Sequence, residues 1–367
     1  FQIENEIRKK LPIIYLNIWD DYPAPMYNKA YYESCDLLMG ISKQTVNINN
    51  LVLGDKAQSK IISYVPHGLN HLYHKPIDES YEKYEEFKKF KNNLFGNKEI
   101  EFSLLFNSRN IRRKQVPDTI WAYVQFIDKL PLEQAQKCAL VLKTHKVDDN
   151  GTDLPAVVEM LCGEDPEGRY NIIFHDQKLD TEQMGWLYNC TDAQIQLTSN
   201  EGWGLSLTEA LLNENLIIAN VTGGMQDQMR FENEHGDWFT PDDRIPSNNT
   251  GAYQKHAPWA FPVFPVCRSI QGSPPTPYIW DDRCKSEDAA EQIMNVYKLT
   301  PEERKLRGKM AREWCLGDEA GLTSEKMSYR IIKNMDKLFD TWVPRKKAEL
   351  INANHQESKV IPHNLIY

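Results

Sequence analysis

The chain has 367 residues, of which 41% are hydrophobic and 26% charged, and this length and composition predict a soluble globular protein of two domains. A formal net charge of −9 argues against a large nucleic-acid-binding surface, although a local basic cleft is compatible with it. Seven cysteines without a Cys-x-x-Cys pair indicate free thiols in a reducing compartment, and without a signal peptide or an apolar run of transmembrane length we expect a cytoplasmic protein.

The amino-terminal part alternates strand and helix signals. Apolar runs predict strands at Ile13–Leu16, Leu37–Met39 and Ile61–Val65, and a helix at Lys43–Leu51. This is about half of a doubly wound α/β domain, and half a parallel sheet would leave an edge exposed and a face uncovered. We therefore expect residues to precede Phe1 in the natural protein; a complete but unusual domain is the alternative.

From Ile100 onward, a strand-then-helix rhythm predicts a second parallel sheet with right-handed crossovers. The predicted strands are Phe102–Phe106, Ala139–Leu142, Asn171–Phe174, Ala193–Leu197 and Leu216–Ala219. The predicted helices are Val116–Leu130, Leu154–Leu161, Thr181–Asn189, Ser206–Asn213, Ser286–Tyr297, Pro301–Leu316 and Thr323–Trp342. A Pro- and aromatic-rich segment from His235 to Asp282 interrupts the rhythm and is too apolar for a disordered linker, so we interpret it as a packed insertion.

The stretch from Ser199 to Leu212 joins a buried strand to a helix through the turn Gly202-Trp203-Gly204, with Glu201 before the turn and Glu209 after it. At the carboxyl end of a strand in an open α/β sheet, glycines let a ligand approach the backbone, and the first N–H groups of the helix attract an anion such as phosphate. The alternative is structural. Ser206 and Glu209 have the spacing of a capping box, and Glu201 could be a solvated loop acid.

A basic turn follows the predicted strand Phe102–Phe106 and carries Arg109, Arg112, Arg113 and Lys114. The guanidinium of Arg presents a planar fork to phosphate oxygens, and Lys supplies a compact positive charge. The turn is therefore a candidate phosphate site, although a basic run on its own is more often a solvated surface.

Together the two stretches resemble the retaining, nucleotide-sugar-dependent glycosyltransferases of family 4, which have the GT-B fold. In that family a Lys follows five residues after the Arg of a Gly-Arg pair. Arg109 and Lys114 keep this spacing, although Ser108 replaces the glycine. The two glutamates of the family, with a Gly-aromatic-Gly turn between them, match Glu201 and Glu209.

Further matches are Val65–Leu69, Leu187–Ser199 and the pair Gly223-Gly224, so the resemblance runs roughly from Ile13 to Leu338. It implies two Rossmann-like doubly wound domains, of which the amino-terminal one is incomplete in this chain.

The predicted organisation is an amino-terminal acceptor-side domain over residues 1–70 and a nucleotide-sugar-binding domain over residues 71–345. The carboxyl-terminal domain would include the insertion at about 235–282. In this fold the last helix crosses back to the amino-terminal domain, and a tail over residues 346–367 could do the same.

The resemblance also implies transfer of a hexose or pentose from a nucleoside diphosphate with retention of anomeric configuration, without a metal or another cofactor. Arg109 and Lys114 would neutralise the diphosphate, and Glu201 would accept hydrogen bonds from sugar hydroxyls. Attack on the same face, with the leaving phosphate taking the acceptor's proton, is the expected mechanism, and double displacement through a carboxylate is the alternative. The donor-binding set would be Gly202, Trp203, Gly204, Leu205 and Glu209, with the base near His175-Asp176.

Asp20 and Asp21 follow the first strand and are the candidates on the acceptor side. Either carboxylate could orient the acceptor hydroxyl; equally, both could be turn and cap residues before the helix near Tyr27. A metal site here is a weak interpretation, because two adjacent carboxylates lack further ligands.

Two other functions fit the same motifs. One is an epimerase or hydrolase of nucleotide sugars, and the other is a catalytically silent subunit that binds sugar nucleotides. The acceptor stays open among a glycan, a protein, a small molecule and a modified nucleic-acid base, and neither the base, the sugar nor the oligomeric state follows from the sequence.

Overall fold

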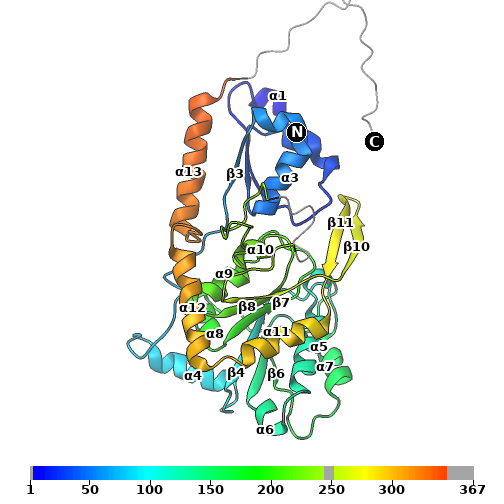
Figure 1. Cartoon of the computed structure of the whole chain (residues 1–367), viewed down its shortest axis with the longest axis vertical. Helices are drawn as coiled ribbons and strands as arrows, with labels where there is room; N and C mark the ends of the chain where they lie inside the picture. The colour runs from blue at the N-terminus through cyan, green and yellow to red at the C-terminus, as the bar shows by residue number, and fades with distance from the viewer. Residues whose placement is uncertain (1–2, 244–251, 345–367) are drawn as a thin grey trace, which may run out of the picture.

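The computed structural model describes residues 3–243 and 252–344. These residues form two α/β domains stacked along the long axis of the molecule, with the smaller amino-terminal domain above the larger carboxyl-terminal one (Figure 1). None of the helices among them is long and apolar enough to cross a membrane. The seven cysteines are free, as predicted.

The amino-terminal domain contains a parallel sheet in the order β1-β2-β3. Its elements are α1 (Glu4–Ile7), β1 (Ile14–Asn17), a 3-10 turn (Met26–Asn28), α2 (Lys29–Ser34), β2 (Leu37–Gly40), α3 (Lys43–Leu53), a second 3-10 turn (Gly54–Ser59) and β3 (Ile61–Tyr64). Side chains alternate between the two faces of a strand, so Leu38 packs on one side among residues of α3 such as Ile48. Leu37 and Met39 pack on the other side. The three predicted strands and the helix between them are confirmed.

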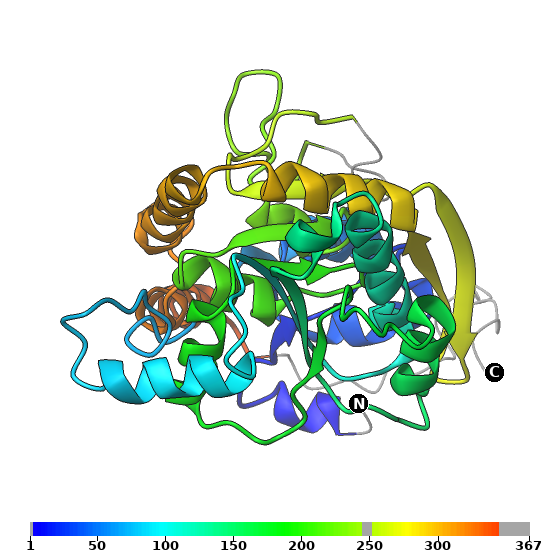
Figure 2. The ribbon, with the colours of Figure 1, turned by 90° about the horizontal axis from the view of Figure 1, so that it is seen from below.

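The carboxyl-terminal domain is built on a six-stranded parallel sheet in the order β6-β5-β4-β7-β8-β9. Its strands are β4 (Phe102–Asn107), β5 (Cys138–Lys143), β6 (Ile172–Phe174), β7 (Ala193–Gln196), β8 (Leu216–Asn220) and β9 (Ala260–Val263). Helices lie on both faces of this sheet, which Figure 2 shows from below. They are α4 (Tyr84–Leu94), α5 (Val116–Ile127), α6 (Leu132–Ala135), α7 (Leu154–Cys162), α8 (Thr181–Asn189), α9 (Leu205–Leu212), α10 (Met225–Gln228), α11 (Ser286–Tyr297) and α12 (Pro301–Leu316).

The segment predicted as an insertion, residues 235–282, is partly a structural element of the sheet. Its residues Ala260–Val263 form β9, which pairs with β8 at the edge of the sheet, so the interpretation as an insertion is wrong for this strand. The rest of the described segment ends in an antiparallel hairpin of β10 (Cys267–Ser273) and β11 (Thr276–Arg283), which extends toward the amino-terminal domain (Figure 1). Residues 244–251 lie outside the described part.

The long helix α13 (Ser324–Thr341) leaves the carboxyl-terminal domain and runs along the amino-terminal one, as expected (Figure 1). Leu338 of α13 is buried against Leu37 and Met39, and so covers the second face of the small sheet. The predicted tail, residues 346–367, lies outside the described residues.

Candidate active site

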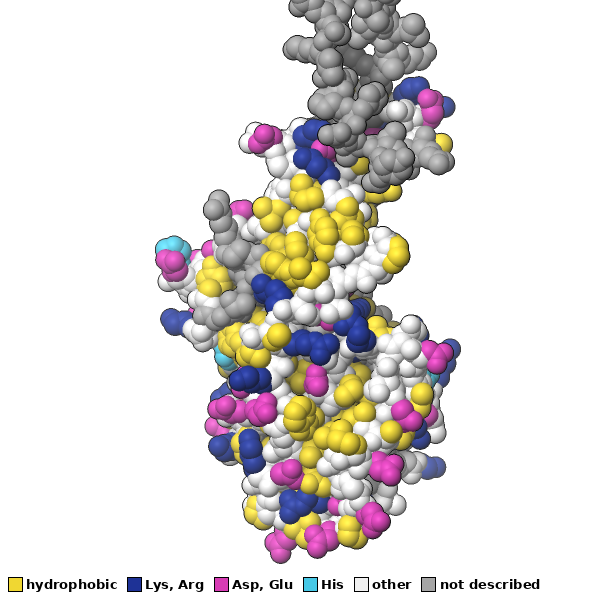
Figure 3. Space-filling model, turned by 90° about the vertical axis from the view of Figure 1, so that its right-hand side faces the viewer, with side chains coloured by type: hydrophobic (Ala, Val, Ile, Leu, Met, Phe, Trp, Pro, Cys, Tyr) yellow, Lys and Arg dark blue, Asp and Glu magenta, His cyan; other side chains and the backbone are white. Residues whose placement is uncertain are grey.

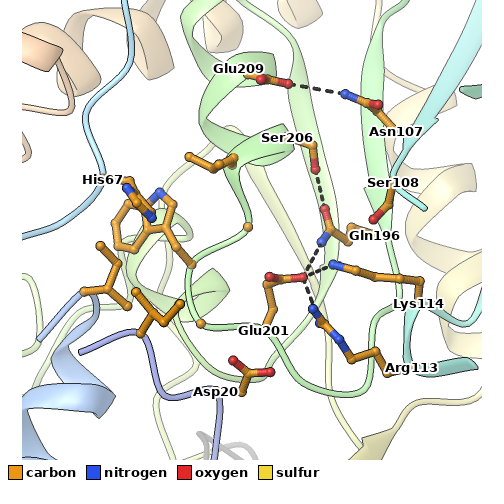
Figure 4. Close-up of a pocket in the computed structure, with 16 residues that line it drawn as sticks. Asp20, His67, Asn107, Ser108, Arg113, Lys114, Gln196, Glu201, Ser206 and Glu209 are labelled. Carbon is orange, nitrogen blue, oxygen red and sulfur yellow. Dashed lines mark hydrogen bonds and ion pairs between the residues drawn. The ribbon is translucent and has the colours of Figure 1, made fainter. Parts of the chain in front are cut away.

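A pocket of about 380 Å³ lies between the two domains, at the carboxyl ends of β4 and β7 (Figure 4). The amino-terminal domain contributes Ile18, Asp20 and Ile41, and His67 comes from the connection to the carboxyl-terminal domain. The remaining lining residues are Asn107, Ser108, Arg113, Lys114, Gln196, Glu201, Gly202, Trp203, Gly204, Leu205, Ser206 and Glu209. The two motifs that are far apart in the sequence therefore meet in one cavity.

Glu201 lies at the centre of a charged cluster. Its Oε2 accepts a hydrogen bond from Arg113 Nη1 at 3.2 Å and another from Lys114 Nζ. A 3-10 turn at Arg112–Lys114 aims these two cations at the loop after β7, and the backbone N–H of Ser199 donates to the carbonyl of Arg113 at 2.8 Å. The turn after one strand is thus tied to the loop after another.

Burial shapes the electrostatics of this cluster. Lys114 is only 7% exposed, and burial lowers the pKa of its ammonium group, while the Glu201 carboxylate acts in the opposite direction. Burial raises the pKa of Asp20, and Arg113 offsets part of that increase. Each charge in this pocket is therefore only partly solvated, which strengthens its interaction with a charged ligand.

The turn Gly202-Trp203-Gly204 brings the backbone at the start of α9 to the pocket that holds Glu201. Gly204 has a φ of +88° and precedes α9, whose first turn has no side-chain cap, and Leu205 and Ser206 at this helix start line the pocket. Gly223 packs against this turn so closely that a Cβ there would lie 2.0 Å from the carbonyl oxygen of Glu201. The uncapped helix start is suited to an anionic group.

The structural alternative for Ser206 and Glu209 is wrong, because neither side chain caps α9. Ser206 Oγ donates to Gln196 Oε1 at 2.6 Å, and Glu209 Oε2 accepts from Tyr188 Oη at 2.7 Å and from Asn107 Nδ2 at 3.3 Å. Glu209 therefore lies at the end of the pocket away from Asp20 (Figure 4).

Arg109 does not face this pocket, and here the expected geometry needs correction. Its side chain is 61% exposed and its Nε pairs with Asp148 Oδ2 at 2.8 Å. Because the backbone turns after β4, Arg109 lies on the opposite side of Ser108 and lines a neighbouring hollow of about 430 Å³. Arg113, rather than Arg109, lines the pocket beside Lys114.

The hollow beside Arg109 adjoins the pocket, since Asn107 and Ser108 line both. Asp176, in the segment where base recognition was expected, also lines it. The expected base region therefore adjoins the pocket that holds Glu201.

The adjacent carboxylates Asp20 and Asp21 point in different directions. Asp20 lines the pocket next to Glu201 (Figure 4), whereas Asp21 is fully buried outside it. Asp21 accepts hydrogen bonds from Tyr22 N at 2.7 Å and from Gln44 Nε2 at 2.9 Å. The role of a buried turn residue, rather than contact with an acceptor, therefore fits Asp21.

Several lining residues were not predicted as site residues. Arg113 was visible as part of the basic run but the family spacing favoured Arg109. Asn107 and Gln196 carry no local motif, and only the folded sheet brings them beside the glutamates. Tyr188 does not line the pocket but supports it, because its hydroxyl bonds to both Asn107 and Glu209. Among residues 3–243 and 252–344, no group of three or more His, Cys, Asp or Glu side chains could hold a metal ion.

Solved structures share this two-domain arrangement. Sucrose-phosphate synthase from Thermosynechococcus elongatus is similar over 86% of this chain, with a TM-score of 0.57 and 17% identity. HepE from Anabaena, in complex with UDP and glucose, is similar over 89% of the chain, with a TM-score of 0.61 and 13% identity. The fold is GT-B, as the resemblance implied.

A third similar structure is the α,α-trehalose 6-phosphate synthase from Burkholderia multivorans, with a TM-score of 0.58 and 9% identity over 90% of this chain. The chain spans 61% of the length of the sucrose-phosphate synthase, 72% of HepE and 67% of the trehalose 6-phosphate synthase. At the level of sequence, no protein-family model matches the chain, and no curated protein matches it.

Proposed function

We propose that this protein is a retaining glycosyltransferase that moves a sugar from a nucleoside diphosphate to an acceptor hydroxyl. The observation that carries the proposal is the convergence of Arg113, Lys114 and the uncapped start of α9 around Glu201 in one pocket. Two cations and free backbone N–H groups suit a diphosphate, and a carboxylate beside them suits sugar hydroxyls.

In the proposed reaction the bond between the sugar C1 and the diphosphate oxygen breaks, and its electron pair leaves with the diphosphate. The acceptor oxygen bonds to C1 on the same face, and its proton passes to the departing phosphate. Arg113 and Lys114 stabilise the charge that develops there, an effect worth about 3 kcal/mol for a single well-placed donor. We propose that these cations do so without a metal.

The two glutamates have separate roles in this proposal. Glu201, next to the cations, accepts hydrogen bonds from the sugar hydroxyls, and Glu209 at the far end accepts them from the ribose. The GT-B fold, which the chain shares with structures described as sugar-phosphate synthases and with HepE bound to UDP-glucose, supports a nucleotide-sugar donor.

The test uses two arginines of the same loop as a matched pair. We expect some nucleotide sugar in a thermal-shift panel to stabilise the wild type, because a ligand of the native state raises its unfolding temperature. Arg113→Ala should weaken binding of that donor about tenfold to a hundredfold, the usual effect of losing a hydrogen bond to a charged group. Arg109→Ala, which removes an exposed side chain outside the pocket, should leave the affinity within about twofold.

Calorimetric titration of both variants with the same donor gives the result, and circular dichroism shows whether each is folded. A loss of affinity in Arg109→Ala with none in Arg113→Ala would contradict the proposed site. Absence of any stabilising nucleotide sugar would contradict the proposed function itself.

A further inference from the structure

A second cavity of about 420 Å³ opens from the pocket on the side of the β10–β11 hairpin. Ile18, Asp20 and Arg113 line both cavities, so a group bound in one lies directly beside a group bound in the other. We call it the hairpin chamber. Its other lining residues include Tyr15, Trp19, Arg112, Asn200, Gln271 and Ser273.

The hairpin that walls the chamber belongs to the carboxyl-terminal domain but is held by the amino-terminal one. Trp280 N donates to the carbonyl of Tyr22 at 2.8 Å, and the rings of Tyr27 and Tyr278 meet edge to face at 4.9 Å. At its base, Asp282 N donates to the carbonyl of Ser199, two residues before Glu201. Contacts to both domains therefore hold the wall of the chamber in place.

Both arginines of the chamber form ion pairs with carboxylates. Arg112 Nη1 pairs with Asp281 Oδ2 at 2.5 Å, and Arg113 pairs with Glu201. Asp281 is fully buried, so drawing Arg112 away to a ligand would leave a buried carboxylate without its closest counter-charge, which is strongly unfavourable. Arg112 is therefore held by Asp281 rather than offered to an anionic ligand, and Arg113 faces the diphosphate in the proposed function.

Apart from Asp20, Asp281 and Gly272, the other lining side chains are aromatic, amide or hydroxyl groups and the aliphatic Ile18 and Ile279. Trp19 is fixed by a hydrogen bond from its Nε1 to the carbonyl of Asp21 at 2.6 Å, and Tyr15 lies on the same wall. Gln271 and Ser273 supply polar groups from the hairpin. On the side of the molecule where the hairpin lies, Figure 3 shows hydrophobic side chains gathered in the upper half and Lys and Arg side chains below them. Flat aromatic surfaces combined with a few amides and hydroxyls suit the apolar faces and hydroxyl edges of a sugar.

Asp20 stands where the two cavities meet. In the part of the chain that the structure describes, no hydrogen bond reaches its carboxylate, which lies beside Glu201 (Figure 4). A carboxylate so placed can accept a hydrogen bond from a hydroxyl group and hold its oxygen toward the donor pocket.

We infer that the hairpin chamber is the acceptor site and that it takes an uncharged carbohydrate, whose attacking hydroxyl is oriented by Asp20. This inference rests on the proposed function and names its acceptor class. The acceptor oxygen bonds to C1 of the donor sugar, the bond to the diphosphate breaks with its electron pair, and the acceptor's proton passes to the leaving phosphate.

The experiment measures sugar transfer by mass spectrometry with the donor found in the thermal-shift panel. Acceptors are glucose, galactose, maltose and sucrose, each compared with glucose 6-phosphate and fructose 6-phosphate. We expect products from at least one uncharged sugar and about tenfold less from its phosphate ester, because the chamber is lined by compensated charges. Ser273→Trp should fill the chamber and lower transfer about a hundredfold.

Controls separate this inference from the proposed function. Ile270→Trp adds the same bulk at a 68% exposed position of β10 that does not line the chamber, and should transfer as the wild type does. Ser273→Trp should still bind and hydrolyse the donor. Asp20→Asn should lower kcat/KM for the acceptor about tenfold or more, the usual effect of losing a hydrogen bond to a charged group.

Each outcome decides the inference. Wild-type transfer by Ser273→Trp, a preference for the phosphate esters, or a donor that binds without transfer to any of the neutral sugars would overturn the acceptor assignment while leaving donor binding intact. A chain that binds no nucleotide sugar would overturn both.

Discussion

The two sheets of this protein are stabilised in different ways. The central strands of the carboxyl-terminal sheet are buried almost throughout, between helices that follow them in the sequence. In the amino-terminal sheet β1 and β3 are largely half-exposed, and the cover comes from elsewhere in the chain, with α13 over one face and the β10–β11 hairpin beside the other. The large domain carries its own core, whereas the small domain depends on two segments of distant sequence.

The two domains also contribute different residues to the pocket. Arg113, Lys114, Glu201 and the glycine turn all follow strands of the buried sheet, so their positions are fixed by a well-packed core. The amino-terminal domain supplies chiefly Asp20 and apolar wall residues. Under the proposed function, donor binding depends on the well-packed large domain and acceptor binding on how the small domain is held against it.

The largest expected effect concerns α13. Leu338→Ala should lower the free energy of unfolding by about 3 kcal/mol, because it opens a cavity in the core beneath the small sheet. If the small domain depends on this helix, hydrogen exchange should accelerate in β1, β2 and β3 while the strands of the large sheet keep their protection. Urea unfolding and exchange mass spectrometry measure the two quantities.

The matched control is Leu306→Ala, a leucine on α12 that is 61% exposed. It should change the stability by no more than about 0.5 kcal/mol. Equal loss of protection in both sheets of Leu338→Ala would show that the two domains unfold as one unit.

An intermediate effect is expected at the glycine pair that supports Glu201. Gly223→Ala would place a Cβ 2.0 Å from the carbonyl oxygen of Glu201 and push the carboxylate out of position. A displacement of about 1 Å in an active site can lower turnover about a hundredfold, and steady-state kinetics would detect it.

Gly54→Ala is the control in the small domain, because its φ of +56° is close to the +52° of Gly223 but its surroundings are open. It should cost about 1–2 kcal/mol of stability through backbone strain and leave turnover unchanged. Similar kinetics in the two variants would mean that strain, rather than contact with Glu201, explains the effect.

The smallest effect is expected where the domains share a pair of buried carboxyl groups. Burial, together with the neighbouring Asp282, raises the pKa of Asp21 well above its usual 3.8. Native Asp21 keeps its proton to a higher pH than the unfolded chain does, so wild-type stability should fall as the pH rises from about 4 through the raised pKa.

Asp21→Asn should remove this decline and gain about 1.4 kcal/mol at pH 8 for each unit by which the pKa is raised. Urea unfolding at a series of pH values measures it. Asp55→Asn, at an exposed position of the same domain, should follow the wild-type curve. A decline that persists in Asp21→Asn would assign the pH dependence to other groups.

The sequence was most informative where function depends on short local motifs. Strand order along the chain and the glycine turn follow from apolar runs and from residues close together in sequence. That Lys114 and Glu201 would lie in one site was implied only by the family resemblance, since the two residues are 87 positions apart. Arg113 could not be chosen over Arg109, because the choice depends on how the backbone curls after β4 and on the competing partner Asp148. Likewise, the sequence could not show that Asp20 rather than Asp21 faces the pocket, because this also depends on the path of the backbone.

The edge strand β9 escaped prediction because it contains a proline, Pro262. Proline cannot donate to a ladder of hydrogen bonds, and so argues against a central strand, but an edge strand tolerates it. The hairpin was equally hidden, since neither β10 nor β11 alternates cleanly between apolar and polar residues. The position of the hairpin depends on its contacts with the amino-terminal domain, which the sequence does not show.

Among residues 3–243 and 252–344, the chain passes between the domains near Leu69 and again near Thr323, and these two segments run side by side. Leu69 N donates to the carbonyl of Leu322, and Ser324 N donates to the carbonyl of Leu69, each at 3.0 Å. Gly68 allows this approach, since a Cβ there would lie 2.1 Å from the carbonyl oxygen of Thr323. The seam lies at the base of α13, on the opposite side of the molecule from the hairpin (Figure 1). A rotation of one domain against the other would therefore have its hinge at this seam. The tip of the hairpin, on the far side of the molecule, would then move the greatest distance.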